Sequence, residues 1–167
     1  MGYTHYHKNL SFTDATWEKL RRDVRKLLKN LPEDVKVQRE HNNDSRPLIG
    51  KDSIIFNGVG ENGHETFLMD KKASEFEFCK TARKPYDLAA CGVLMLASVH
   101  ATSGQISSDG VNGAWKHEPT GNSYPDNVDQ EWKDAWKHFQ TIFPKIDKEK
   151  AFKLFHNKEV ICRLIDA

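Results

Sequence analysis

The chain has 167 residues, of which 38% are hydrophobic and 29% are charged, and its formal net charge is +1. This length suits one domain with its own core and is short for two, so we predict a single domain over residues 1–167. The near-neutral charge argues against a protein that holds nucleic acid through a large basic field, and nucleic acid is not expected as a partner.

Cysteine usage and hydropathy exclude further classes. Cys79, Cys91 and Cys162 lie in apolar surroundings without a CxxC spacing, which predicts reduced core residues and neither a disulfide framework nor a metal site. The most apolar run, Leu88 to Ala101, is shorter than the roughly 20 residues that cross a bilayer, and the polar start lacks the apolar segment of a signal peptide. We therefore expect a cytoplasmic protein without membrane contact, metal or cofactor.

The start of the chain, Gly-Tyr-Thr-His-Tyr-His, is rich in strand formers and predicts a first strand with Tyr3, His5 and His7 on one face. Tyrosine and histidine together form a platform on which a purine or sugar could stack. Two histidines at i, i+2 could also bind a metal, but no carboxylate or cysteine nearby in the sequence completes a set. We expect a hydrogen-bonding face instead.

An amphipathic helix follows, with Thr13 as its N-cap and apolar residues three and four apart from Trp17 to Leu31. Its other face is basic and could bind nucleic acid, but the interspersed Glu18 and Asp23 favour a solvated face. The segment 35–38 is a candidate edge strand. The cations of the helix are Lys19, Arg21, Arg22, Arg25, Lys26 and Lys29.

The strand-like segments on either side of the glycine-rich loop 58–63 predict a hairpin with a wide tip. The loop is not a dinucleotide fingerprint, because it joins two strands and opens no helix. Asn57 ends the first strand, and His64 and Glu65 open the second, so an amide, an imidazole and a carboxylate come close together. His64 and Glu65 are the candidate catalytic residues, although a regular strand points them to opposite faces.

The segment 76–80 alternates as a further strand and leads through a polar corner into a helix that we expect to start at Pro85. Residues 85–101 are apolar on nearly every side, which predicts a central buried helix. Lys80 and Arg83, with Lys84, precede the N-terminus of this helix, where free backbone N–H groups favour an anion such as phosphate. A solvated loop is the alternative.

The last third of the chain predicts a strand over 105–110, a helix from Asp129 to Phe143 and a short helix after Asp147. The segment of about 111–128 is long for a compact domain, and we expect a loop insertion or lid there, with disorder as the alternative. Residues 160–165 resemble a terminal strand that could pair across a homo-oligomer. Together the elements predict an α+β fold, with an antiparallel or mixed sheet of about five strands packed on the central helix 85–101 and flanked by amphipathic helices.

Four blocks of the sequence carry a resemblance to a known family. They are Gly-Tyr-Thr-His-Tyr at 2–6, Ile-Ile-Phe-Asn-Gly-Val-Gly at 54–60 with Gly-His-Glu-Thr-Phe at 63–67, Phe-Cys-Lys-Thr-Ala-Arg-Lys-Pro-Tyr-Asp at 78–87, and Ser-Ser-Asp-Gly at 107–110. In this order they resemble a family of small uncharacterised proteins that are common in tailed phages and large DNA viruses. Members usually have Trp where this chain has His7, and a shorter link after the last block. The resemblance implies a viral protein in the cytoplasm of an infected host cell.

The polar residues of these blocks suit a small anionic ligand that is held by aromatic, hydrogen-bonding and ionic contacts. The predicted ligand-binding residues are Tyr3, His5, Asn57, His64, Glu65, Lys80, Thr81, Arg83, Tyr86, Ser108 and Asp109.

Three functions are open at this point. The first is a binding protein that captures a phosphorylated nucleotide without turning it over, as a sponge for an immune signal of the host would. The second is a nucleotide or phosphoester hydrolase, with His64 or His5 as general base, Glu65 or Asp109 as its partner, and Lys80 with Arg83 stabilising developing charge. The third is a protein that blocks a host enzyme through the loop around Trp115.

Overall fold

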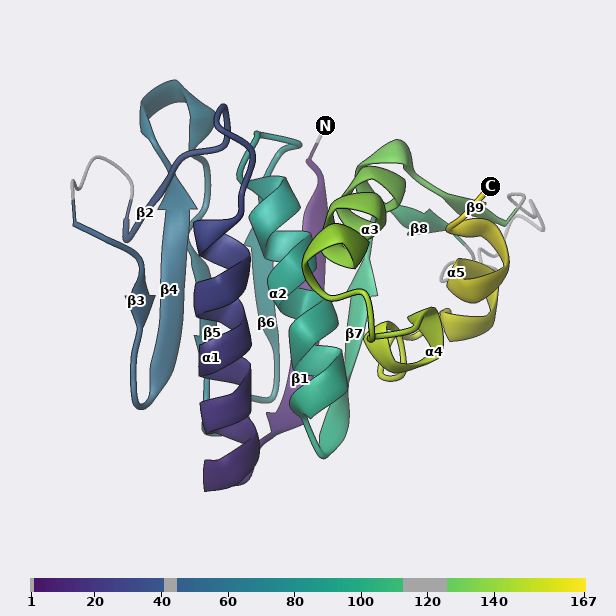
Figure 1. Cartoon of the computed structure of the whole chain (residues 1–167), viewed down its shortest axis with the longest axis horizontal. Coiled ribbons are helices and arrows are strands. Elements are labelled where there is room, and N and C mark those ends of the chain that lie inside the picture. Colours follow the sequence, from purple (N-terminus) through teal and green to yellow (C-terminus); the bar gives the residue numbers. More distant parts are fainter. Residues whose placement is uncertain (1, 41–44, 113–125) are drawn as a thin grey trace.

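The computed structural model describes residues 2–40, 45–112 and 126–167, and its fold is α+β, as predicted (Figure 1). Helices α1, α2 and α3 lie side by side in front of the strands, and the short elements of the C-terminal third gather at one end. The strands are β1 (Thr4–Ser11), β2 (Val37–Gln38), β3 (Leu48–Ile49), β4 (Ser53–Gly58), β5 (Phe67–Asp70), β6 (Glu77–Lys80), β7 (Ser103–Ser108), β8 (Val111–Asn112) and β9 (Asn127–Val128).

The helices of the described residues form where the apolar residues recur every three or four positions. Thr13 caps α1 as expected, in a capping box with Thr16. None of these helices is long and apolar enough to cross a membrane. They are α1 (Asp14–Lys29), α2 (Asp87–His100), α3 (Gln130–Ile142), α4 (Lys148–Ala151) and α5 (Lys158–Leu164), with one 3₁₀ turn, η1 (Gly60–Asn62).

The strands form two separate antiparallel sheets and a ribbon, which corrects the prediction of one sheet of about five strands. One sheet has the order β6-β1-β7; in the other, β4 pairs with β2, β3 and β5. Where the two sheets approach each other, the Glu65 N–H donates to the Lys80 carbonyl, but β5 and β6 form no ladder within the described residues. The β1 register places His5 opposite Cys79 on one side and Ser108 on the other.

Helix α2 is buried from Ala89 to Ser98 and contacts α1 and α3. Gly92 allows the close approach of α1, since a Cβ at this position would lie 2.7 Å from Cδ2 of Leu27. The helix begins at Asp87, two residues later than predicted, because Pro85 belongs to the turn in which the Asp87 N–H donates to the Lys84 carbonyl.

Two predictions for the C-terminal third concern the segment 160–165 and the lid. Residues 158–164 form helix α5, so the predicted terminal strand over 160–165 is wrong. Ile161 and Ile165 are both buried and four residues apart, which is a helical period in a run of strand-forming residues. The ends of the predicted lid are paired as the β8–β9 ribbon, but residues 113–125 lie outside the described part of the chain.

Candidate functional site

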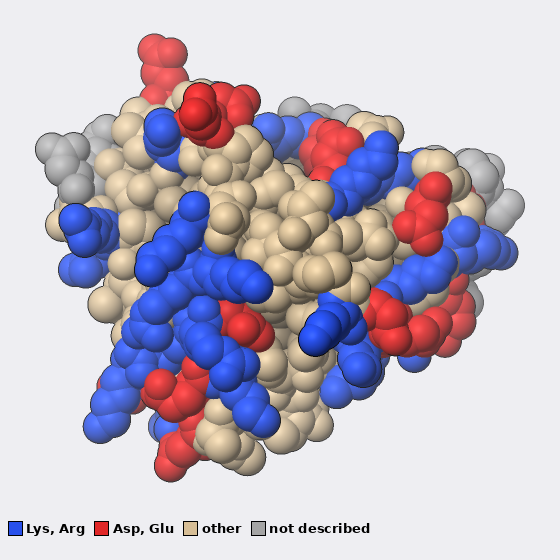
Figure 2. All heavy atoms as spheres, in the orientation of Figure 1, with Lys and Arg blue, Asp and Glu red and all other residues tan. Residues whose placement is uncertain are grey.

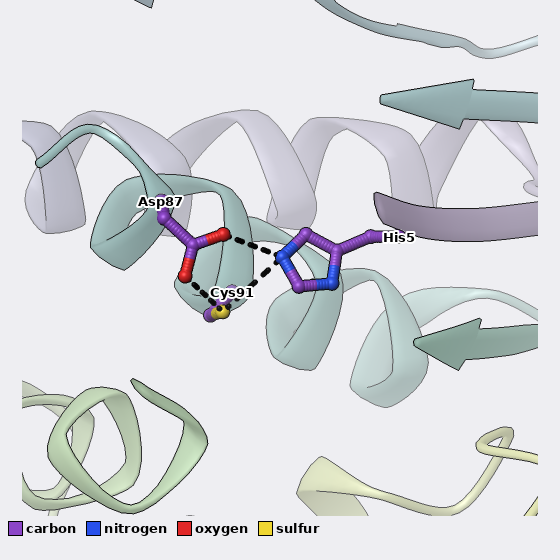
Figure 3. A group of neighbouring side chains, drawn as sticks. All are labelled: His5, Asp87 and Cys91. Carbon is purple, nitrogen blue, oxygen red and sulfur yellow. Dashed lines mark hydrogen bonds and ion pairs between the residues drawn. The ribbon is translucent and has the colours of Figure 1, made fainter. Parts of the chain in front are cut away.

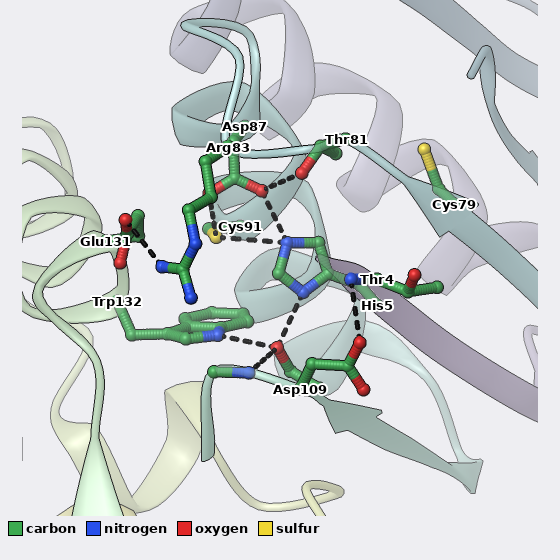
Figure 4. Close-up of polar contacts among 12 residues, drawn as sticks. Thr4, His5, Cys79, Thr81, Arg83, Asp87, Cys91, Asp109, Glu131 and Trp132 are labelled. Carbon is green, nitrogen blue, oxygen red and sulfur yellow. Dashed lines mark hydrogen bonds and ion pairs between the residues drawn. The ribbon is translucent and has the colours of Figure 1, made fainter. Parts of the chain in front are cut away.

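Strand β1 turns His5 inward, toward the N-terminal end of α2 and the end of β7 (Figure 4). The His5 ring is 2% exposed and makes two hydrogen bonds. Its Nε2 lies 2.6 Å from Oδ1 of Asp87, and its Nδ1 lies 2.8 Å from Oγ of Ser108. Three elements that are far apart in sequence therefore meet at one imidazole.

The hydrogen bonds around Ser108 determine which nitrogen of His5 carries the proton. Oγ of Ser108 accepts from the Gly110 N–H at 3.0 Å and from Nε1–H of Trp132 at 2.9 Å. Both of its lone pairs are then in use, so the hydroxyl donates to Nδ1 of His5. It follows that Nε2 carries the ring proton and donates a hydrogen bond to Asp87. The two hydrogen bonds therefore point in the same direction, from Ser108 to His5 and from His5 to Asp87.

The hydrogen-bonded series Ser108–His5–Asp87 has the same order as the triad of a serine hydrolase. The environment of Ser108, however, does not suit nucleophilic attack. Ser108 is 6% exposed, and its lone pairs are occupied by the two N–H donors. We conclude that Ser108 positions the His5 ring.

Asp87 lies at the centre of the buried polar group. Its Oδ1 also accepts from Oγ1 of Thr81 at 2.6 Å, and its Oδ2 lies 3.6 Å from Sγ of Cys91. Burial alone would raise the pKa of Asp87, but His5 and the hydrogen bonds from His5, Thr81 and Cys91 outweigh it, and the pKa lies below its usual value. Asp87 is therefore a stabilised, ionised carboxylate.

Cys91 follows Asp87 by one helical turn and completes a group of three potential metal ligands (Figure 3). Its Sγ lies 3.7 Å from Nε2 of His5, and the ligand atoms of the three residues all lie within 4.8 Å of one another. Burial raises the pKa of the Cys91 thiol well above its usual value. The sequence analysis missed this metal-ligand set, since His5 is separated from Asp87 by 82 positions.

Arg83 lies at the edge of the buried group, and its charge is shared with two carboxylates. Its guanidinium is 3.1 Å from Asp129 and 2.7 Å from Glu131, and it lies 4.1 Å from the centre of the Tyr3 ring. The φ angles of Ala82 and Arg83 are +52° and +59°, so both lie in the left-handed region. This strained turn aims Arg83 at Tyr3.

The other residues of the predicted corner divide between structural and exposed positions. All four hydrogen-bonding positions of the Asn57 amide are used within the hairpin, by Gly58, His64 and Thr66. The Glu65 carboxylate accepts from the Lys80 N–H, and the Glu65 carbonyl accepts from the Tyr86 hydroxyl. Lys80 is half-buried, with its side chain over Gly2, and His64 is exposed.

The structure thus brings together Tyr3, His5, Thr81, Arg83 and Ser108 in one region and uses Asn57, Glu65 and Tyr86 to connect the hairpin with the corner. Asp109, the remaining residue of the predicted set, follows Ser108 at the end of β7 and lines a pocket on the opposite face of the sheet.

That pocket has a volume of about 300 Å³ and lies on the face of the β6-β1-β7 sheet that is turned away from α2. The Tyr6 hydroxyl donates to Oδ1 of Asp109 at 3.1 Å, and the ring of Tyr6 lies 6.0 Å from that of Phe76. Phe76 is 56% exposed, an unusual fraction for a large apolar side chain. The pocket is lined by Tyr6, His7, Lys8, Phe76, Gln105, Ser107, Ser108 and Asp109.

Most of the pocket residues were missed by the sequence analysis, although a signal was available. Tyr6 and Lys8 alternate with the inward-facing His5 and His7, so they share the outer face of β1. Pairing of Tyr6 with Ser107 in the ladder then extends this face across β7. The alternation in β1 identifies the pocket residues only when the order of the strands in the sheet is known.

The basic residues of α1 form a separate surface feature, and Figure 2 shows Lys and Arg side chains gathered over this helix. Its acidic residues are engaged, because Glu18 pairs with Arg21 and Asp23 pairs with His100. The Arg21 guanidinium also donates to the Ile49 carbonyl. The expectation that nucleic acid is not a partner stays a prediction.

A comparison of the chain with protein families, with curated proteins and with solved structures finds no match.

Proposed function

We propose that the protein binds a phosphorylated nucleotide in the outer-face pocket and does not turn it over. The observation that carries this proposal is the pocket itself, in which the exposed ring of Phe76 and the half-buried ring of Tyr6 lie beside polar and charged side chains. Its volume of about 300 Å³ lies at the lower end of the range for small-molecule sites and suits a ligand of the size of a mononucleotide.

The aromatic side of the pocket provides the surface for a base. Tyr6 and Phe76 are near neighbours with a ring-centre distance of 6.0 Å and an angle of 32° between their planes. Stacking of a base on an aromatic side chain contributes about 1–3 kcal/mol. Because every base has a π face, this contact selects for an aromatic ligand without selecting one base.

The polar side of the pocket provides contacts for the rest of the ligand. Lys8 is exposed and makes no ion pair within the described part of the chain, so its ammonium group is available to a phosphate. Ser107 offers a hydroxyl next to it, and Gln105 contributes an amide whose nitrogen also bonds Nδ1 of His156 at 2.8 Å. The carboxylate of Asp109, which also lines the pocket, accepts hydrogen bonds from the Tyr6 hydroxyl and the Thr4 N–H.

The position of the phosphate differs from the one expected from the sequence. Arg83 already faces two carboxylates, so a phosphate at the corner would compete with Asp129 and Glu131. Among the described residues, Lys8 forms no ion pair that a phosphate would have to displace. The proposed ligand class is unchanged, and the proposed binding surface moves from the corner to the outer face.

Two observations support binding without turnover. Ser108 also lines the pocket, but its hydroxyl donates to Nδ1 of His5 on the α2 side of the sheet, and its lone pairs accept the Gly110 and Trp132 N–H groups. The carboxylate of Glu65, a candidate catalytic group, is bound to the Lys80 N–H. In the viral context that the sequence resemblance implies, a protein of this kind would serve as a sponge for a host immune nucleotide and so act against host defence.

Calorimetry on the full chain tests the proposal, with nucleoside monophosphates, cyclic dinucleotides and ADP-ribose as probes. Phe76 and Phe78 provide a matched pair, because they are 56% and 55% exposed and only Phe76 lines the pocket. Loss of one stacking contact predicts that Phe76→Ser weakens binding about 5- to 150-fold. Phe78→Ser should cause a smaller loss, because the Phe78 ring contacts Phe76 at 5.9 Å but does not itself line the pocket.

The absence of heat with every probe would overturn the proposal, and so would equal losses in the two variants. Chromatography of the ligand released by heating separates binding from catalysis. Unchanged ligand supports capture, whereas new products would favour the hydrolase.

A further inference from the structure

We propose that His5, Asp87 and Cys91 bind one divalent transition-metal ion of the zinc class in the interior of the protein. None of the three ligands lines the proposed nucleotide pocket, and Ser108, which orients His5, is shared by the two sites. A histidine nitrogen, a carboxylate oxygen and a cysteine sulfur together form a donor set that zinc and cobalt accept.

The distances between the donor atoms suit such an ion. Metal–ligand bonds of about 2.0–2.3 Å in a tetrahedral arrangement place neighbouring ligand atoms about 3.3–3.7 Å apart. Sγ of Cys91 already lies 3.7 Å from Nε2 of His5 and 3.6 Å from Oδ2 of Asp87. If the ion binds Oδ2, then Oδ1 keeps its hydrogen bond from Thr81, and the direct His5–Asp87 contact opens to admit the metal.

The protein holds the three donors on rigid elements. Asp87 and Cys91 are four residues apart and share one face of α2, while His5 projects from the middle strand of its sheet. Thr81 orients the carboxylate and Ser108 orients the imidazole, as the outer partners of metal ligands do. All three donors are buried, so a bound ion would exchange slowly with solvent.

An unsatisfied polar group beside the site gives independent support. The Tyr3 hydroxyl is buried and has no hydrogen-bond partner in the described structure. Its ring meets the His5 ring edge-on at 5.2 Å. Burial raises the pKa of Tyr3, and Cys91 and Asp87 add to the effect, so the phenol stays protonated and lies within electrostatic reach of both groups. The hydroxyl lies beside Gly110 and Trp132, which both donate to Ser108, so a buried polar group without a partner stands next to the residue that orients His5.

Metal binding changes the protons of the site in a defined way. Cys91 binds as the thiolate and releases one proton to solvent. The ring proton of His5 moves from Nε2 to Nδ1 and is donated to Ser108. The Ser108 hydroxyl hydrogen turns away, and Oγ gives up one of its two present N–H donors. No oxidant or reductant is needed.

Titration of the metal-free full chain with Co²⁺, without nucleotide, tests the site. We expect one ion per chain, with visible ligand-field bands of a tetrahedral ion and a near-ultraviolet thiolate-to-cobalt band. Cys91→Ser should abolish the thiolate band. It should also weaken binding by more than the roughly 10- to 100-fold that the loss of an outer-shell partner costs. Cys79→Ser and Cys162→Ser are the controls and should keep the band.

Each outcome is decisive and is read separately from nucleotide binding. A wild-type protein without the thiolate band overturns the proposal, even if the Cys91 variant does not fold. A band that survives in Cys91→Ser and disappears in Cys162→Ser would also overturn it, since the metal would then sit at the half-buried cysteine of α5. Asp87→Asn gives a second variant, whose circular dichroism is compared with wild type before the titration.

Discussion

The guanidinium of Arg83 covers the ring of Tyr3, with 4.1 Å between the guanidinium carbon and the ring centre. The side chain of Arg83 is 48% exposed, whereas Tyr3 is 2% exposed, so the arginine forms part of the cover over an interior tyrosine. Asp129 and Glu131 hold the other side of the guanidinium. One exposed side chain thereby connects β1, the corner before α2 and the start of α3.

Arg83→Ala should lower the free energy of unfolding by about 1–2 kcal/mol, because a cation–π contact and two partly exposed ion pairs are lost together. Arg83→Lys should recover less than half of the loss, since an ammonium group lacks the planar face that stacks on Tyr3. Urea unfolding of both variants measures this. Lys84→Ala, next to it in the same turn, serves as the control. Full recovery by lysine would show that charge alone matters here.

Ala82→Gly should stabilise the protein by about 0.5–1 kcal/mol. The φ of Ala82 is +52°, a conformation that costs an alanine about 1–2 kcal/mol and glycine almost nothing, and the greater freedom of glycine in the unfolded chain offsets part of the gain. Ala101→Gly is the control. Ala101 has a φ of −67°, so the same change at this position should destabilise the protein. Thermal unfolding compares the two. A lower melting temperature for Ala82→Gly would contradict the strain argument.

Gly92→Ala should destabilise the protein by about 1–3 kcal/mol, although alanine normally favours a helix. The added Cβ would lie 2.7 Å from Cδ2 of Leu27 at the α1–α2 contact, so Leu27 must shift within a packed core. In a Leu27→Ala background the clash is removed, and Gly92→Ala should then be neutral or stabilising. A double-mutant cycle by urea unfolding measures the coupling. Additive effects would show that Leu27 does not set the cost.

Stability should fall as the pH is lowered from about 6.5 to about 4, because His7 is buried as the neutral form. Burial lowers the pKa of His7 to about 4, while the nearby Asp70 opposes the shift in part. The unfolded chain, with an ordinary histidine pKa near 6.5, therefore binds more protons in this window, and full stability is present above it. The contribution of His7 is about 3 kcal/mol.

The pH dependence of urea unfolding in wild type and His7→Phe measures this effect. The variant should lose less stability between about pH 6.5 and 4 than wild type does. His64→Gln is the control, since His64 is exposed, and its profile should follow that of wild type. A His7→Phe profile as steep as that of wild type would assign the acid sensitivity to other groups.

The local sequence pattern was sufficient to predict the structure where the prediction concerns the geometry of a single strand or helix. The alternation of the first residues predicted that Tyr3, His5 and His7 share one face, and in the structure all three are buried, because period two is a property of any strand. The same rule failed at 160–165, where Ile161 and Ile165 satisfy a helical period that strand-forming side chains concealed. At 160–165, packing against the core overrode the intrinsic preference of these side chains for a strand.

By itself, the sequence determined the α+β class, the buried α2 segment and most of the polar residues that meet around His5. Only the tertiary structure decided how these residues are paired. His5 meets Asp87 and Ser108 across 82 and 103 positions, and such contacts depend on strand order, which local propensity does not encode. The same folding gave Arg83 two carboxylate partners, directed the side chain of Ser108 to His5 and that of Asp109 to Tyr6, and placed Cys91 beside His5.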